Sequence, residues 1–161
     1  MTLWDSLIDA AEEIDRYGLF KDDKMSLCHL DLQPRNIMAE IQKDQSLKIT
    51  GCLDWDSAVF APKFVGCAPP RWLWADEEGE YNEDDELGAN DVPSTPEKQE
   101  LKSIFEQAVG ADYIEYAYAA QYPLARMLFR IAKDGVWLNE HLASVDKFMA
   151  EWDSLRNSLE R

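Results

Sequence analysis

Residues 28–56 read CHLDLQPRNIMAEIQKDQSLKITGCLDWD, and this stretch decides the fold of the chain. Two runs of alternating apolar and polar residues lie on either side of residues 43–46, a polar segment rich in turn-forming side chains. This arrangement is typical of a β-hairpin, which we place over residues 37–53. Polar residues flank the hairpin, with Asn36 before it and Asp54 after it.

The apolar residues of the two strands limit how the strands can pair, because directly opposed residues point to the same face of an antiparallel pair. One register closes around a three-residue loop and pairs Ile41 with Ile49, Ala39 with Gly51 and Ile37 with Leu53. That register places Asn36 directly opposite Asp54. A second register slips by two residues and needs a five-residue loop. In both, Asn36 and Asp54 lie side by side at the open end of the hairpin.

Helical patterns lie on both sides of the hairpin. Apolar residues recur at helical spacing over residues 3–17, after a Thr2–Asp5 capping box and before Gly18, a plausible stop. The order of elements predicts an α+β domain that is mostly helical.

Three further helices are expected in residues 96–161. The first begins at Pro96 behind the cap Thr95, and the second covers 112–133 with a break near Pro123. The third is capped by Ser144, and its apolar stripe consists of Val145, Phe148, Met149, Trp152, Leu155 and Leu159.

Composition and charge exclude several classes of function. The chain has 161 residues, of which 46% are apolar, so it can form one domain with a core. Its formal charge of −16 opposes binding to nucleic acid or to an anionic membrane and favours cationic ligands. Three cysteines without a CxxC pair indicate buried thiols in a reducing compartment. The acidic N-terminus is unlike a targeting peptide, and no apolar run of about 18 residues occurs. We therefore expect a cytoplasmic protein.

The most acidic segment is residues 76–91, DEEGEYNEDDELGAND, with nine acidic residues in sixteen. Such a segment is typical of a solvated, flexible loop, which we extend over residues 76–95. The pattern of an EF-hand is absent. Binding of a divalent cation by this segment is kept as a separate hypothesis.

The polar residues around the hairpin have the spacing of a phosphotransferase catalytic loop. That loop reads H-x-D-x-x-x-x-N, and a further Asp follows a hairpin. His29, Asp31 and Asn36 have this spacing, and Asp54 follows the predicted hairpin. The alternative for Asp31 and Asn36 is an Asx turn that leads into a strand. A serine hydrolase is not indicated, because the G-x-S-x-G motif is absent.

The wider context supports one family. HLDLQPRNI, followed by LDWDSAVFAPKFVGCAPPRWLW, resembles the aminoglycoside phosphotransferase family, and the fungal members in particular. The resemblance covers roughly residues 1–75 strongly and the C-terminal helices more loosely. It implies the C-terminal lobe of a protein-kinase-like fold, with residues 28–56 as its catalytic loop, hairpin and metal-binding segment. It also implies Mg²⁺ and ATP as cofactors and transfer of the γ-phosphate to a small-molecule hydroxyl.

The resemblance also implies a role for each matching residue. Asp31 would be the catalytic base, and His29 would support the loop by hydrogen bonding. Asn36 and Asp54 would bind the magnesium of Mg-ATP. Asp56 matches a second acidic position of the family and is a further candidate metal ligand.

A kinase-like enzyme also has a small lobe with a Gly-rich loop and a strand lysine. No pair of the seven glycines is spaced like G-x-G, so we expect a C-lobe without its N-lobe. Such a chain is predicted to be inactive alone and to expose an apolar face that a homodimer or a partner chain covers. The alternative function is a pseudoenzyme or interaction module that keeps the fold without catalysis.

The substrate class is only broadly indicated. The acidic chain favours a cationic hydroxyl compound. Trp72 and Trp74 could line a cation pocket, since aromatic faces attract cations, but such residues more often pack in the core.

Overall fold

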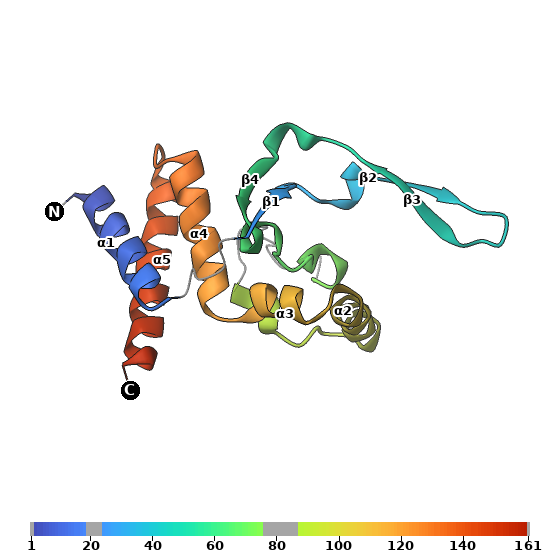
Figure 1. Ribbon diagram of the computed structural model, residues 1–161. Coiled ribbons are helices and arrows are strands. Elements are labelled where there is room, and N and C mark those ends of the chain that lie inside the picture. The colour runs from blue at the N-terminus through green and yellow to red at the C-terminus, as the bar shows by residue number, and fades with distance from the viewer. Residues whose placement is uncertain (1, 19–23, 76–86, 161) are drawn as a thin grey trace.

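The computed structural model describes residues 2–18, 24–75 and 87–160. The fold is α+β and mostly helical, as predicted, and within the described residues it holds two separate two-stranded antiparallel sheets. Figure 1 shows the helices gathered into a body from which one hairpin reaches away. In these ranges, no helix has both the length and the apolar character needed to cross a membrane.

Three helices form the larger part of the body: α1 (Leu3–Arg16), α4 (Gln121–Asp134) and α5 (Asn139–Leu159) (Figure 1). Each helix contributes one apolar stripe to a common core, because residues three and four apart lie on the same face. The buried members are Leu7, Ala10, Ile14, Leu124, Met127, Ile131, Val145, Phe148 and Trp152.

A polar contact also links the first and last helices. Glu13 Oε2 accepts a hydrogen bond from the indole Nε1 of the buried Trp152 at 3.1 Å, and it pairs with Arg156 at 3.2 Å. Buried indole N–H groups usually find such a partner. The contact therefore ties α1 to α5 across 139 residues of sequence.

Two of the three predicted helix caps are present. Thr2 Oγ1 accepts the backbone N–H of Asp5 at 3.2 Å, and Asp5 Oδ2 accepts the backbone N–H of Thr2 at 2.6 Å. At the start of α2 (Pro96–Val109), Thr95 Oγ1 accepts the backbone N–H of Lys98 at 3.4 Å. These contacts satisfy N–H groups that a helix cannot satisfy internally.

The predicted cap of the last helix is wrong. Helix α5 begins at Asn139, and Ser144 lies inside it. His141 takes the capping role, because its Nδ1 accepts the backbone N–H of Trp137 at 3.1 Å and that of Leu138 at 3.4 Å. A histidine three residues into a helix is an uncommon cap, so the serine was the more obvious candidate.

The expected break in the second C-terminal helix is confirmed, but its position differs. Helix α3 (Ala111–Tyr118) ends before Ala119 and Ala120, and α4 follows. Pro123 is the third residue of α4. At that position a backbone N–H would have no partner within the helix, so the proline ring costs no hydrogen bond.

A second core joins the smaller sheet to the helices. Strand β1 (Met25–Cys28) pairs with β4 (Val59–Pro62), and a 3₁₀ turn, Lys63–Gly66, follows β4. The buried members of this core are Cys28, Ala61, Phe64, Val65, Cys67, Tyr116, Tyr122 and Ala125. Because Cys28 at the end of β1 is buried in this core, the first residue of the following loop is held in position.

The buried Arg126 stabilises the same region. It is 2% exposed, and its guanidinium donates to the backbone carbonyls of Phe64, Tyr116 and Ala117. A buried cation needs such partners, since leaving it without hydrogen bonds would cost several kcal/mol. Arg126 therefore fixes the 3₁₀ turn against α3.

The predicted hairpin consists of β2 (Ile37–Ile41) and β3 (Leu47–Cys52). Near the turn Ile41 lies opposite Leu47, two residues from its partner Ile49 in the first register. A β-bulge at Met38 and Ala39 then shifts the pairing by one residue. The first register, including the direct opposition of Asn36 and Asp54, is therefore wrong.

One face of the hairpin is apolar and open to solvent. Ile41 is 77% exposed, Leu47 72% and Ile49 66%. An isolated two-stranded hairpin is only marginally stable in water. Most of the acidic segment, residues 76–86, lies outside the described residues.

Candidate functional site

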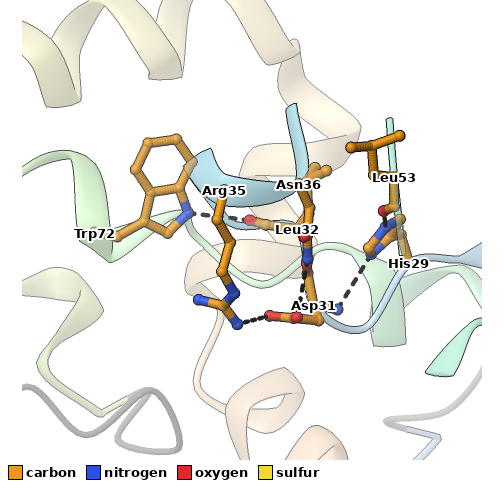
Figure 2. A network of polar contacts seen from close by, with 7 residues as sticks. All are labelled: His29, Asp31, Leu32, Arg35, Asn36, Leu53 and Trp72. Carbon is orange, nitrogen blue, oxygen red and sulfur yellow. Dashed lines mark hydrogen bonds and ion pairs between the residues drawn. The ribbon is translucent and has the colours of Figure 1, made fainter. Parts of the chain in front are cut away.

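The candidate site is the loop between β1 and β2 together with the residues after β3. The loop runs from His29 to a 3₁₀ turn, Pro34–Asn36, that leads into β2. Pro34 suits the start of this turn because its backbone angle is already helical. Figure 2 shows Asn36 bonded to Asp31, and His29 between the Asp31 backbone and Leu53.

Asn36 holds the carboxylate of Asp31. Its Nδ2 donates to Asp31 Oδ2 at 2.9 Å and to the Asp31 backbone oxygen at 2.8 Å (Figure 2). Asn36 is only 6% exposed, so these bonds satisfy a buried amide. Both amide hydrogens are committed to Asp31, which leaves Oδ1 as the acceptor that Asn36 can offer to a ligand.

His29 connects the loop to the end of β3. Its Nε2 donates to the backbone oxygen of Leu53 at 2.8 Å, since a carbonyl can only accept. Its Nδ1 accepts the backbone N–H of Asp31 at 3.3 Å. The two contacts require the neutral imidazole with the proton on Nε2. His29 therefore links the loop to the residue that follows β3.

Trp55 packs against His29. The two rings meet edge to face with centroids 4.7 Å apart, and the Trp55 indole donates to the backbone oxygen of Cys52 at 3.0 Å. Trp55 thus limits the orientations open to the imidazole. The sequence analysis did not assign this role, although Trp55 lies between the two candidate aspartates.

Asp54 directly follows Leu53, the residue whose backbone is hydrogen-bonded to Asn36. The backbone N–H of Leu53 donates to the Asn36 oxygen at 2.8 Å, so Asp54 is one residue beyond that pair. Asp54 adopts a left-handed conformation, with φ 60° and ψ 58°. Such backbone strain in a residue other than glycine is concentrated at functional sites.

The carboxylates of Asp54 and Asp56 are exposed. Within the described residues, neither carboxylate forms a hydrogen bond or an ion pair. Asp31 differs, because both of its oxygens already have partners. Asp54 and Asp56 are therefore the carboxylates of this region that a ligand could engage without displacing another group.

These donors suit Mg²⁺ chemically. Magnesium prefers hard oxygen ligands and is usually held by one or two protein carboxylates together with waters and substrate phosphates. The Asn36 amide oxygen and the Asp54 carboxylate are ligands of that kind. In the part of the chain that the structure describes, no three His, Cys, Asp or Glu side chains are grouped to hold a metal. The residues therefore fit a two-ligand site that phosphate completes, rather than a cage made of protein ligands alone.

Arg35 is a site residue that the sequence analysis missed. Its guanidinium pairs with Asp31 Oδ1 at 2.6 Å (Figure 2). The Arg35 side chain is 60% exposed and that of Asp31 28% exposed. An exposed ion pair of this kind contributes at most about 1 kcal/mol, so a ligand can displace it. The i,i+4 spacing of the two residues was the available signal.

The two candidate pocket tryptophans have structural contacts instead. Trp74 is 4% exposed and packs on Phe105 with ring centroids 5.6 Å apart, so it belongs to the protein interior. The Trp72 indole donates to the backbone oxygen of Leu32 at 3.2 Å and thereby supports the loop (Figure 2). The prediction of a cation pocket is wrong for Trp74.

No family model, no curated protein and no solved structure matches this chain. The class of the site therefore rests on its own geometry. It is a loop in which the Asn36 amide is bonded to the Asp31 carboxylate and the His29 imidazole accepts the Asp31 backbone N–H, and two exposed carboxylates lie beside it after the hairpin.

Proposed function

We propose that residues 1–161 form the large lobe of a phosphotransferase resembling the aminoglycoside phosphotransferase family, with a kinase-like C-lobe fold. The observation that carries the proposal is the bonding of Asn36. Its amide holds the Asp31 carboxylate, while its backbone oxygen binds the residue next to Asp54. A turn that only leads into a strand would not require the Asp31 carboxylate, the Asn36 amide and Asp54 to lie in the same place.

The proposed roles of the residues are those that the family resemblance implies, and the contacts of the loop are compatible with them. Asp31 would orient a substrate hydroxyl and accept its proton at Oδ1, where the hydroxyl replaces Arg35. Asn36 Oδ1 and Asp54 would hold Mg²⁺, and Asp56 would offer a second carboxylate. Mg-ATP, when bound, would supply the γ-phosphoryl group. The acidic surroundings favour a cationic hydroxyl compound as substrate.

The proposal includes a partner. The chain lacks a G-x-G pair that could cover the phosphates, so this part of the nucleotide site would have to come from another polypeptide segment. The exposed apolar face of Ile41, Leu47 and Ile49 is proposed as the surface where a complementing lobe or a second copy packs. The isolated chain is expected to have little or no phosphotransferase activity.

Magnesium-dependent binding of ATP, measured by titration calorimetry, tests the site. We expect weak binding that requires Mg²⁺ and that Asp54→Asn reduces at least about tenfold, since a charge-assisted ligand is lost. Asparagine tolerates the left-handed conformation at this position, so the fold is retained. Asp9→Asn removes the same charge from an exposed position on α1 and serves as the matched control.

The alternative is a pseudoenzyme or interaction module. The feature that favours it is the exposed hairpin face, which needs a partner whether or not nucleotide binds. A folded chain that binds no Mg-ATP, but associates through the hairpin in light scattering, would support this alternative and contradict the enzymatic role. Cation binding by residues 76–91 remains a separate prediction, which a calcium titration of the melting temperature tests.

A further inference from the structure

The turn between α4 and α5 carries the most exposed large apolar side chain among the described residues. Trp137 is 81% exposed, and Leu138 beside it is 58% exposed. The Trp137 ring is nevertheless fixed by its own turn, because its indole Nε1 donates to the backbone oxygen of Asp134 at 2.8 Å. The conformation of this turn therefore sets where the ring lies on the surface.

Gly135 makes room for the indole ring within the turn. Its backbone has a φ of 76°, which lies in the left-handed region that favours glycine. A Cβ added at this position would lie 2.5 Å from the Nε1 atom of Trp137. Another residue at position 135 would therefore strain the backbone and push the indole away from its acceptor. The position of Trp137 thus depends on the geometry of this one turn.

His141 closes the turn from the first residues of α5. Its Nδ1 accepts two backbone N–H groups, that of Trp137 at 3.1 Å and that of Leu138 at 3.4 Å. An imidazole nitrogen accepts a hydrogen bond only while it is unprotonated, so both contacts require the neutral ring with its proton on Nε2. A proton on Nδ1 would turn this acceptor into a donor that faces two other donors. The closed turn and the imidazolium are therefore incompatible.

Among the described residues, the charged groups that face His141 come from both helices. Arg130 and Asp134 of α4 and Lys147 of α5 line the same cavity of about 170 Å³ as the imidazole. Asp134 pairs with Lys133 at 3.1 Å, and Arg130 and Lys147 have contacts of their own. These groups influence the pH at which the ring takes up a proton. They do not change the outcome, because a ring protonated at both nitrogens has no acceptor whatever charges surround it.

We infer that His141 makes the α4–α5 turn sensitive to pH. At neutral pH the imidazole accepts both backbone N–H groups and holds the turn closed. As the pH falls through the range in which histidine side chains are protonated, about 6.5 for a free side chain, Nδ1 takes up a proton from solvent and releases the backbone of Trp137 and Leu138. The start of α5 then loses its cap, and the exposed tryptophan is no longer held. The inference is independent of the proposed phosphotransferase function.

NMR titration of the full chain between about pH 8 and pH 5 tests the inference directly. We expect the backbone N–H signals of Trp137 and Leu138 to shift with the same midpoint as the ring signals of His141, because one proton breaks both hydrogen bonds. Signals of Trp137 and Leu138 that stay in place while the His141 ring is protonated would overturn the inference. The measurement uses the wild-type protein, so its outcome does not depend on whether a variant folds.

A His141→Gln variant separates this histidine from the other titrating groups of the chain. Glutamine at the third position of a helix can accept the same backbone N–H through its side-chain oxygen, but it does not titrate. Between about pH 7.5 and pH 5.5, the melting temperature of the wild-type protein should fall by about 2–4 °C more than that of the variant, which corresponds to the loss of one helix cap. His29, the other histidine, is present in both proteins, so its effect cancels. Equal falls in the two proteins would contradict the role of His141.

Discussion

The three-helix core and the β2–β3 hairpin are built from similar apolar patterns but have opposite surroundings. In the core, Leu7, Leu124 and Phe148 are at most 3% exposed, because α1, α4 and α5 pack around one buried cluster. In the hairpin, Ile41, Leu47 and Ile49 are at least 66% exposed. The comparison teaches that an apolar face predicts a contact, but the partner that makes the contact need not lie within the chain.

The largest expected effect comes from one substitution made in both regions. Leu124→Ala in the core should lower the free energy of unfolding by about 2–5 kcal/mol, because it removes buried methyl groups and leaves a cavity. Leu47→Ala in the hairpin should change it by less than about 0.5 kcal/mol. Urea denaturation of the two variants measures both values. A loss in Leu47→Ala comparable to that in Leu124→Ala would mean that the hairpin face is buried in solution.

The reactivity of the native cysteines distinguishes the hairpin from the second core without any substitution. Cys52, in the hairpin, is exposed, whereas Cys28 and Cys67 are buried in the second core. Burial also raises the pKa of the Cys67 thiol, which reduces the reactive thiolate. We expect the Cys52 thiol to react with a disulfide reagent at the rate of a free cysteine. The thiols of Cys28 and Cys67 should react at least about a hundredfold more slowly. Mass spectrometry of the labelled peptides identifies which cysteine reacted.

A Cys52→Ser variant is the control for that assignment. It should lose the fast phase and keep the slow ones. A fast phase that persists in this variant would show that the second core opens easily, and would contradict the burial of Cys28 and Cys67.

The smallest expected effect is a pH dependence that arises in both regions. Backbone and side-chain hydrogen bonds with Thr2 hold the pKa of Asp5 below its ordinary value of 3.8. The side chain and backbone of Ser46 lower the pKa of Asp44 in the hairpin turn in the same way. A lowered pKa contributes stability above the ordinary value, and this stability is lost as pH falls through the folded value. Both contributions should therefore begin to decrease as pH falls below about 4 and be absent only below the lowered pKa of each aspartate.

The two aspartates should stabilise different parts of the protein. Asp5→Asn should make the free energy of global unfolding less dependent on pH in the acid range, because α1 packs into the core. Asp44→Asn should affect only the signals of the hairpin turn. Circular dichroism melts and NMR spectra between pH 3 and pH 6 measure these responses, and an equal effect on global melting would contradict the comparison.

Local sequence was enough to predict the features that depend on neighbouring residues. The Thr2–Asp5 capping box, the Thr95–Pro96 helix start and the hairpin strands are all present. Each rests on hydrogen bonds or alternation within a few residues, so the pattern carries most of the information. The wrong cap at Ser144 has a local cause too, because His141 accepts the backbone N–H groups that precede Asn139 and the helix begins there.

The grouping of the candidate residues in one loop was predictable, but their bonding was not. The spacing of His29, Asp31 and Asn36 indicated one loop, and their mutual hydrogen bonds are consistent with that. The register beyond Met38 was not predictable, because a β-bulge shifts it by one residue and alternation alone does not encode the shift. The left-handed backbone of Asp54 also depends on how β3 ends.

The sequence by itself determined the class of the fold, the order of the elements and the candidate residues of the loop, because these follow from periodicity, capping and spacing. Only the tertiary structure decided that Trp74 is core, that Arg35 pairs with Asp31, and that Arg130 and Lys147 meet at one cavity. It also decided which apolar face is covered and which is open. The physical reason is that burial and ion pairing depend on the packing of whole elements, and no local pattern records which surface an element will meet.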